Sequence, residues 1–267
     1  MNPRRMPQHT LLWLWCSSAA LAAHAQALDG ADPTEPFHAR QGGAVRLSAS
    51  TIANAAGEDR RGLRFMPSVE YHWDNGWMVG SDRGVAYNFS RDPRLQYGLG
   101  LSVDMGRQAS ETGALAGMGR IDAKPEVAAF LSKELAQDWR ITSSLRYGSG
   151  NDRQGAVAEL GLNHTINLAP DWRLGLNAST KWANSAYMQT FYGVTSSQAA
   201  SSGHAVSTPS GGLTELGAGV NLNHHITRQV SVTGGINANS LRGEARSSSV
   251  VTKPDSLTGQ LSVNYSF

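Results

Sequence analysis

Apolar and polar residues alternate strictly, with a period of two, along much of this chain. In WRLGLNASTKW, apolar residues from Trp172 to Trp182 fall on one face, where Thr180 is the only polar residue. This period is typical of β-strands, whose successive side chains point to opposite sides of the sheet. The segment carries a tryptophan at each end, which is the pattern of a tilted membrane strand with an aromatic residue at each interface.

We distinguish eleven alternating segments, which begin near residues 43, 63, 76, 95, 124, 138, 155, 172, 213, 229 and 256. Single-chain bacterial barrels, however, have an even number of strands. Unbroken alternation from Gly76 to Phe89 would place Arg83 on the lipid face at mid-membrane, at a cost of about 2–4 kcal/mol. A turn at Ser81-Asp82-Arg83-Gly84 removes this cost and predicts twelve strands, with ten as the alternative.

The connections between these segments come in two sizes. The short ones have good turn chemistry, and they are Asp74-Asn75-Gly76, Ala136-Gln137-Asp138, Ala169-Pro170-Asp171 and Thr227-Arg228-Gln229. The long ones cover about 107–122, 184–212 and 242–255. The sequence therefore predicts an all-β fold, a transmembrane antiparallel up-and-down β-barrel with short periplasmic turns and long outer loops. A soluble β-sandwich is the alternative, and Pro67 is an irregularity, because it removes a ladder hydrogen bond from an expected strand.

The N-terminus has the three parts of a secretory signal peptide. NPRR is followed by an apolar run and by Ala23-His24-Ala25 as a small-residue cleavage site. The run from Leu11 to Ala25 is shorter than the ~20 residues of a membrane-spanning helix. We therefore expect a cleaved signal peptide at 1–25, a periplasmic tail at 26–41 and an outer-membrane barrel at 42–267, in contact with lipid and assembled by the barrel-insertion machinery.

Charge and cysteine content exclude two classes of function. The signal peptide contains Arg4 and Arg5 and no acidic residue, so its removal abolishes the formal net charge of +2. Without a basic excess or a basic run, the chain lacks the electrostatic signature of a nucleic-acid-binding protein. The single cysteine, Cys16, also lies in the signal peptide, which excludes disulfides and thiolate chemistry in the mature chain.

Charged residues of both signs are expected to point into the barrel, and they are Glu126, Glu134, Arg140, Arg146, Glu159, Arg173 and Lys181. They could line a selective channel, or they could form cross-strand ion pairs that fill a narrow barrel. We favour the second interpretation, because ten to twelve strands leave little room inside. It predicts that the protein shows no large stable conductance.

The sequence contains no convincing catalytic or metal-binding set. His72 and Glu70 point inward and could be half of a Ser-His-acid triad, but no serine lies in a nucleophile motif. His224 and His225 are adjacent on a strand and face opposite ways, which makes a poor metal site. His224, like His164, is expected on the outward face near a strand end. We therefore expect a protein that is not an enzyme and has no cofactor or metal.

The stretch Ser185–Gly203 divides into two halves. The first half concentrates large apolar residues, which we expect to form a rim or plug element where the chain leaves the membrane. The second half starts with a capping box at Thr195–Gln198 and has Gly203 at the position that ends a helix, so a short surface helix is expected there. If the stretch binds a ligand, its candidate residues are Tyr187, Met188, Gln189, Phe191, Tyr192 and Gly193, with Tyr187, Gln189 and Tyr192 to be tested first.

Several segments resemble the MipA/OmpV family of outer-membrane proteins. The most specific is YMQTFYGVTSSQA, which follows TKWANS and precedes GLTELGAGVNLNHHIT; LRFMPSVEYHWDNGW, GRIDAKPEVAAFLSKEL and the terminal LSVNYSF are also similar. The resemblance covers about residues 43–267. One departure is at 52–61, which lacks the character of the family's first loop.

The resemblance implies a non-enzymatic barrel. Members of the family are described as scaffolds that bring a lytic murein transglycosylase together with a penicillin-binding protein, and others as adhesins or antibiotic-responsive surface proteins. A scaffold role is the first hypothesis for this chain, and a narrow channel or transporter, or a surface ligand-binding or adhesin barrel, is the alternative. The terminal residues Tyr265 and Phe267 are similar to the signal that the barrel-insertion machinery reads.

Overall fold

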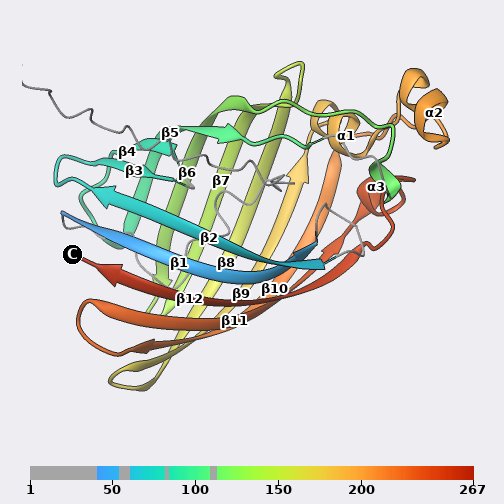
Figure 1. Ribbon diagram of the computed structural model, residues 1–267. Helices are drawn as coiled ribbons and strands as arrows, with labels where there is room; N and C mark the ends of the chain where they lie inside the picture. Colours follow the sequence, from blue (N-terminus) through green and yellow to red (C-terminus); the bar gives the residue numbers. More distant parts are fainter. Residues whose placement is uncertain (1–40, 54–60, 82–83, 109–112) are drawn as a thin grey trace, which may run out of the picture.

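The computed structural model describes residues 41–53, 61–81, 84–108 and 113–267. The expected signal peptide, residues 26–40 of the expected tail and the two central residues of the turn expected at 81–84 lie outside the described residues. Within the described part of the chain, twelve antiparallel strands form a closed barrel, so the prediction of twelve strands is confirmed (Figure 1). Each strand pairs with its neighbours in sequence, and β1 closes the barrel against β12.

The strands are β1 (Gly42–Ala53), β2 (Arg61–His72), β3 (Trp77–Gly80), β4 (Gly84–Asn88), β5 (Leu95–Asp104), β6 (Lys124–Ala136), β7 (Trp139–Ser149), β8 (Gly155–Ala169), β9 (Trp172–Ala183), β10 (Gly212–His225), β11 (Val230–Leu241) and β12 (Asp255–Ser266). The long connections hold the short helices η1 (Gly113–Leu115), α1 (Ser185–Tyr192), α2 (Ser196–Ser202) and α3 (Gly243–Arg246). Figure 1 shows α1, α2 and α3 together at one end of the barrel. No helix in the described residues has the length and apolarity needed to cross a membrane.

The barrel is apolar outside and polar inside, which is the reverse of a soluble protein. On β5, the outward-facing Leu99 is 57% exposed, whereas the inward-facing Gln96 is 1% exposed. The outward residues of the other strands follow the same rule, and the buried residues of the wall include many serines and asparagines. Such a surface is stable in lipid, and the closed sheet leaves no unpaired edge at the seam, so the fold is that of a transmembrane barrel.

The β3–β4 hairpin is the shortest part of the wall. Its strands have four and five residues, and β3 pairs with β2 only at the short-turn end of β2, from Glu70 to His72. Gly84 follows the turn with a φ of +74°, and a Cβ there would meet the carbonyl oxygen of Leu101 at 2.0 Å. Glycine is therefore required at the start of β4, where the backbone passes close to β5.

The same hairpin accounts for Pro67 in the interior of β2. The carbonyl of Val69 accepts a hydrogen bond from the Ser81 N–H at 2.9 Å, so the backbone polar groups of Val69 face β3. Those of Pro67 face the same side, because alternate residues of a strand share a direction. The position that an N–H would occupy on Pro67 therefore points away from β1, so the β1–β2 ladder loses no hydrogen bond. This position lies beyond the last described β2–β3 pair. The expected loss therefore does not fall on the β1–β2 ladder, and Pro67 lies on the β3 side of β2, beyond the pairs described between these two strands.

At the short-turn end, contacts between the start of β1 and the residue after β12 close the barrel. Gly43 and Phe267 exchange two backbone hydrogen bonds, each of 2.9 Å. The Phe267 ring lies 6.5 Å from that of Tyr71 and 6.2 Å from that of Tyr265. A Cβ on Gly43 would meet the Phe267 ring at 2.7 Å, so the glycine makes room for this ring. Phe267 therefore joins the first and last strands through both its backbone and its side chain.

Candidate functional site at the long-loop end of the barrel

Helix α1 starts directly after β9 and is fixed to the neighbouring strand. The side chain of Asn184 accepts a hydrogen bond from the Tyr187 N–H at 2.9 Å, which caps the helix. The same side chain accepts from the Ala156 N–H at 3.0 Å and donates to the Gln154 carbonyl at 2.8 Å, both at the start of β8. One asparagine thus sets both the first turn of α1 and its position beside β8.

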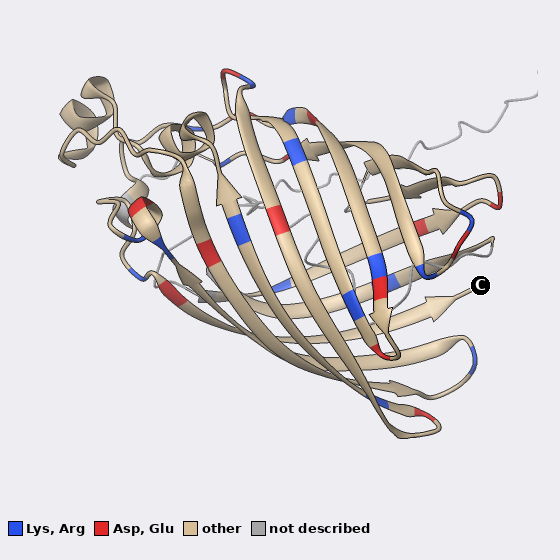
Figure 2. Ribbon diagram, turned by 180° about the vertical axis from the view of Figure 1, so that it is seen from behind, with Lys and Arg blue, Asp and Glu red and all other residues tan. Residues whose placement is uncertain are grey.

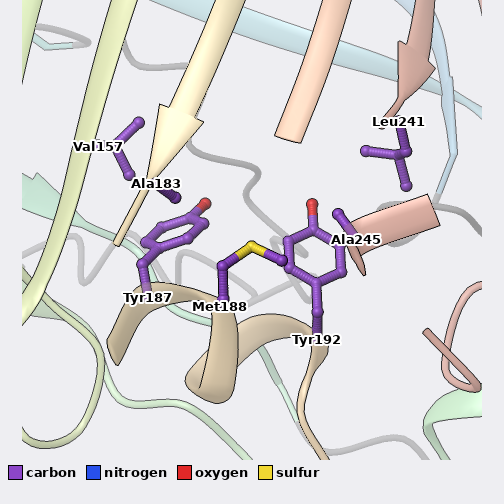
Figure 3. Packing of buried hydrophobic residues seen from close by; sticks show 7 residues of the cluster. All are labelled: Val157, Ala183, Tyr187, Met188, Tyr192, Leu241 and Ala245. Carbon is purple, nitrogen blue, oxygen red and sulfur yellow. The ribbon is translucent and has the colours of Figure 1, made fainter. Parts of the chain in front are cut away.

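The buried side of α1 faces into the barrel. Tyr187, Met188 and Tyr192 are at most 8% exposed. They pack against residues on the inner surface of β8, β9 and β11 and against α3, namely Val157, Ala183, Leu241 and Ala245. Figure 3 shows Met188 between the two tyrosine rings, which rise from α1 toward the ends of the strands. The aromatic half of the stretch is therefore a plug element inside the mouth.

Two other loops hold α1 in this position. Arg107, in the connection after β5, donates to the Phe191 carbonyl at 3.2 Å. Ser248, in the connection after α3, donates to the Tyr192 carbonyl at 2.6 Å. The Phe191 ring stacks on that of Tyr187 at a centroid distance of 4.4 Å. The end of α1 is thus tied to loops from two other parts of the wall.

Helix α2 continues this network on the outer surface. The capping box expected at Thr195 and Gln198 is present, and Gly203 ends the helix in the left-handed conformation with a φ of 78°, so this prediction is confirmed. Gln198 donates to the Met118 carbonyl at 2.8 Å, and Ser201 donates to the Gly117 carbonyl at 2.7 Å. A second apolar cluster of Leu115, Met118, Val194 and Val250 joins three of the long connections. The long loops therefore form one packed structure over the mouth.

The remaining candidates of this stretch support the turn between the two helices. Gly193 donates its N–H to the Gln189 carbonyl at 3.1 Å. A Cβ on Gly193 would meet the Gln189 side chain at 2.3 Å, so this glycine permits the close approach of the two residues. The structure brings Tyr187, Met188, Phe191 and Tyr192 together and places the half-buried Gln189 beside Gly193.

A row of alternating charges crosses the inner wall from β6 to β10. We call Glu126, Arg146, Glu159, Lys181 and Glu215 the charge ladder, and Figure 2 shows acidic and basic positions side by side on neighbouring strands. Arg146 lies 3.6 Å from Glu126 and 3.0 Å from Glu159. Lys181 lies 3.5 Å from Glu159 and 3.8 Å from Glu215. The ladder has three carboxylates and two cations, so it carries a net negative charge.

The other inward charges expected from the sequence are not part of this ladder. The register places Glu134 opposite Arg140, but Arg140 donates to the Ser132 hydroxyl at 3.2 Å. His72 and Glu70 lie 3.9 Å apart on β2, at the short-turn end and therefore far along the barrel from α1. Within the described residues, no group of three or more His, Cys, Asp or Glu side chains is placed to hold a metal ion.

The surroundings of Tyr187 and Tyr192 raise the pKa of both phenols. Burial raises the pKa of Tyr192 from its ordinary value of 10.0 to about 12, and the nearby Glu215 adds to this effect, while Lys181 and Arg107 oppose it. Burial likewise raises the pKa of Tyr187 well above 10.0. Both phenols are therefore held neutral in a site from which bulk water is excluded.

These pKa shifts predict an alkaline transition of the mouth. Both tyrosines ionise more readily in an opened loop than in the packed one, so their contribution to stability is complete below pH 10. The contribution of Tyr192 is lost as the pH rises through about 12. We expect the near-ultraviolet circular dichroism of the packed tyrosines to disappear in this range together with a rise in tyrosinate absorbance. The variant Tyr192→Phe should lose the part of the absorbance change that titrates near pH 12. A tyrosinate titration that is complete at pH 10 in the folded protein would contradict the burial.

The fold and its apolar belt define the chain as a transmembrane barrel of the outer-membrane class. Solved structures of that class are similar to it: an outer-membrane channel of the COG4313 group from Pseudomonas putida F1 has 11% identity and a TM-score of 0.51 over 89% of this chain and 99% of its own. The KdgM porin has 10% identity and a TM-score of 0.45 over 84% and 99%.

The chain belongs to the family of the MltA-interacting protein MipA, whose model matches residues 45–267. The match covers nearly the whole barrel, and it confirms the resemblance seen in the sequence. No curated protein matches the chain in sequence.

Proposed function

We propose that this protein is a non-enzymatic outer-membrane barrel that acts by contact with periplasmic partners, linking the outer membrane to enzymes that synthesise or cleave murein. In this proposal the signal peptide at 1–25 is removed on export, and the tail at 26–41 and the short turns face the periplasm. The observation that carries the proposal is the inward fold of α1. Met188 and Val157 are each 1% exposed, so α1 packs tightly against the inner wall at the mouth, which supports a role other than conduction.

The partner is proposed from the family. The family is described by its interaction with MltA, a murein transglycosylase, and its resemblance also implies a penicillin-binding protein as a second partner. Such partners can reach only the periplasmic end, where the turns are short and fixed. At this end, Asp74 accepts a hydrogen bond from the Gln41 N–H at 2.9 Å, which orients the chain where the tail enters β1. Exposed basic side chains at this end include Arg91 and Arg228.

The test is capture of a purified murein transglycosylase by the full-length barrel in detergent. We expect the wild-type protein to retain the enzyme, and the variant Arg91→Glu/Arg228→Glu to bind it about tenfold more weakly, because charge reversal at an interface disturbs its electrostatic complementarity. The matched control is Gln198→Ala, which removes a polar side chain from the outer surface at α2.

Retention by wild type and by the α2 variant, with loss in the double variant, supports a periplasmic contact surface. Failure of the correctly folded wild-type barrel to retain the enzyme under any condition contradicts the scaffold role. Equal loss in the two variants, with retention by the wild type, indicates a defect of folding, which circular dichroism detects.

The charge ladder favours a second candidate function, a narrow pathway for small cations. Its net negative charge lies on the inner wall just below α1, and Tyr192 reaches toward Glu215 and Lys181. Small-cation flux through vesicles should then depend on the ladder, and Glu215→Gln should reduce it relative to wild type. Equal flux in both proteins would exclude the pathway.

A further inference from the structure

The barrel carries the same three-residue arrangement twice at its short-turn end. In each copy, a turn ends in Asp-Trp, and a histidine lies directly opposite the tryptophan on the neighbouring strand. The register pairs Trp139 with His164 and Trp172 with His224. The ring centroids are 4.3 Å and 4.1 Å apart, with interplanar angles of 18° and 16°, so both pairs are stacked. We call these the Trp–His pairs.

The backbone of each turn fixes the protonation pattern of its histidine. His164 Nδ1 lies 3.2 Å from the Asp138 carbonyl oxygen, and His224 Nδ1 lies 3.3 Å from that of Asp171. Each carbonyl also accepts the N–H of the residue after the histidine, at 2.9 Å. Because a carbonyl oxygen can only accept, Nδ1 carries the proton in both rings. In the neutral ring, Nε2 is then a hydrogen-bond acceptor.

Both histidines of the Trp–His pairs are partly exposed, and the side chain of His224 is 31% exposed. Among the described residues, none forms a hydrogen bond or ion pair with Nε2 of His164 or His224. The tryptophans are on the outward face, with Trp139 at 40% and Trp172 at 37% exposure. Outward aliphatic residues flank both pairs on the side of the membrane core, so the pairs lie at the level where hydrocarbon gives way to lipid headgroups.

The groups that converge there have one chemical preference. Each pair carries a hydrogen-bond acceptor nitrogen and an electron-rich indole ring, and the second pair also has the Asp171 carboxylate, which is 51% exposed and 3.6 Å from His224 Nδ1. All three attract a cation that can donate hydrogen bonds, and none of them favours a phosphate. We propose that the two Trp–His pairs are binding sites for lipids with a primary ammonium headgroup, which they hold in the periplasmic leaflet.

This proposal is independent of the scaffold function and is tested by lipid retention. Full-length barrel is reconstituted with phosphatidylethanolamine, phosphatidylcholine or phosphatidylglycerol of the same acyl chains, and retained lipids are counted by native mass spectrometry. We expect two retained phosphatidylethanolamine molecules, at about fivefold to tenfold preference over phosphatidylcholine, whose trimethylated ammonium cannot donate a hydrogen bond. Preference for phosphatidylglycerol, or equal retention of all three, overturns the proposal.

The variants His164→Phe and His224→Phe keep a stacked ring and remove Nε2. We expect each to lose one of the two lipids and the double variant to lose both, with unchanged circular dichroism and heat-modified migration on gels. Trp77→Phe is the matched control, because Trp77 is an exposed interfacial aromatic residue next to Tyr87, outside both pairs. Full retention in the double histidine variant overturns the proposal, as does equal loss in the control.

Discussion

Replacing Arg146 with methionine is expected to lower the free energy of unfolding by about 3 kcal/mol, because it leaves two carboxylates without their shared cation in a nearly dry part of the wall. The Arg146 side chain is 3% exposed and that of Glu126 is 2% exposed. Glu159 is 24% exposed and keeps Lys181 at 3.5 Å, so the loss falls mainly on Glu126. The measurement is equilibrium urea unfolding in lipid vesicles, followed by tryptophan fluorescence.

A matched variant separates the ion pair from a general effect of removing an arginine. Arg140 points inward on the same strand, and its described partner is the neutral Ser132 hydroxyl, so Arg140→Met should cost less than about 1 kcal/mol. Adding Glu126→Gln to Arg146→Met should restore part of the lost stability, because the uncompensated charge is removed. Equal losses for the two arginine variants would contradict the role of the charge ladder in holding β6, β7 and β8 together.

Deleting Phe267 is expected to abolish most insertion of the barrel. The deletion removes both backbone hydrogen bonds to Gly43 and the ring contacts with Tyr71 and Tyr265, so closure loses about 2–3 kcal/mol. The residue is also part of the expected signal for the barrel-insertion machinery. The measurement is the heat-modifiable fraction of protein in outer-membrane preparations, with cleavage of the signal peptide scored in parallel.

Phe267→Tyr is the control for this deletion, since it keeps the backbone, the ring and the room provided by Gly43. It should insert like wild type. Wild-type insertion of the deleted chain would show that neither closure at the seam nor recognition depends on Phe267, and reduced signal-peptide cleavage would place the defect in export instead.

The strands could be predicted from sequence because the lipid imposes a simple rule on them. Each outward position must be apolar and each inward position can be polar, so alternation marks nearly every strand, and the cost of Arg83 on the lipid face was sufficient to divide β3 from β4. Glu215 was missed because a bulge between Leu213 and Glu215 shifts the alternation by one residue. A local irregularity of the ladder thus hides an inward charge.

The site at the mouth could be predicted only in part. The capping box of α2 is a local pattern and was recognised, whereas the aromatic half was expected as a rim or plug element without a helix. Its helix is stabilised by contacts that are distant in sequence, such as those from Arg107, 84 residues from Phe191, and from Ser248, 56 residues from Tyr192. No periodicity marks such loop residues, since each acts through a single contact.

The repeated Trp–His pairs show a related limit. The outward placement of His164 and His224 followed from alternation, but the stacking partner of each depends on register, which the sequence leaves open. Once the register is known, the two copies share the same turn residue, the same ring contact and the same carbonyl acceptor. The strand register therefore shows that these interfacial residues form the same arrangement twice.

The most direct test of this account is the conductance of the wild-type protein in planar lipid bilayers, measured beside a variant in which Tyr187, Met188 and Tyr192 are replaced by alanine. A mouth filled by α1 predicts no stable porin-sized step for wild type and the appearance of steps in the variant, whose fold is checked by circular dichroism. A stable porin-sized step from the wild-type protein would contradict a mouth closed by α1, and with it the proposal that the barrel acts by contact rather than by conduction.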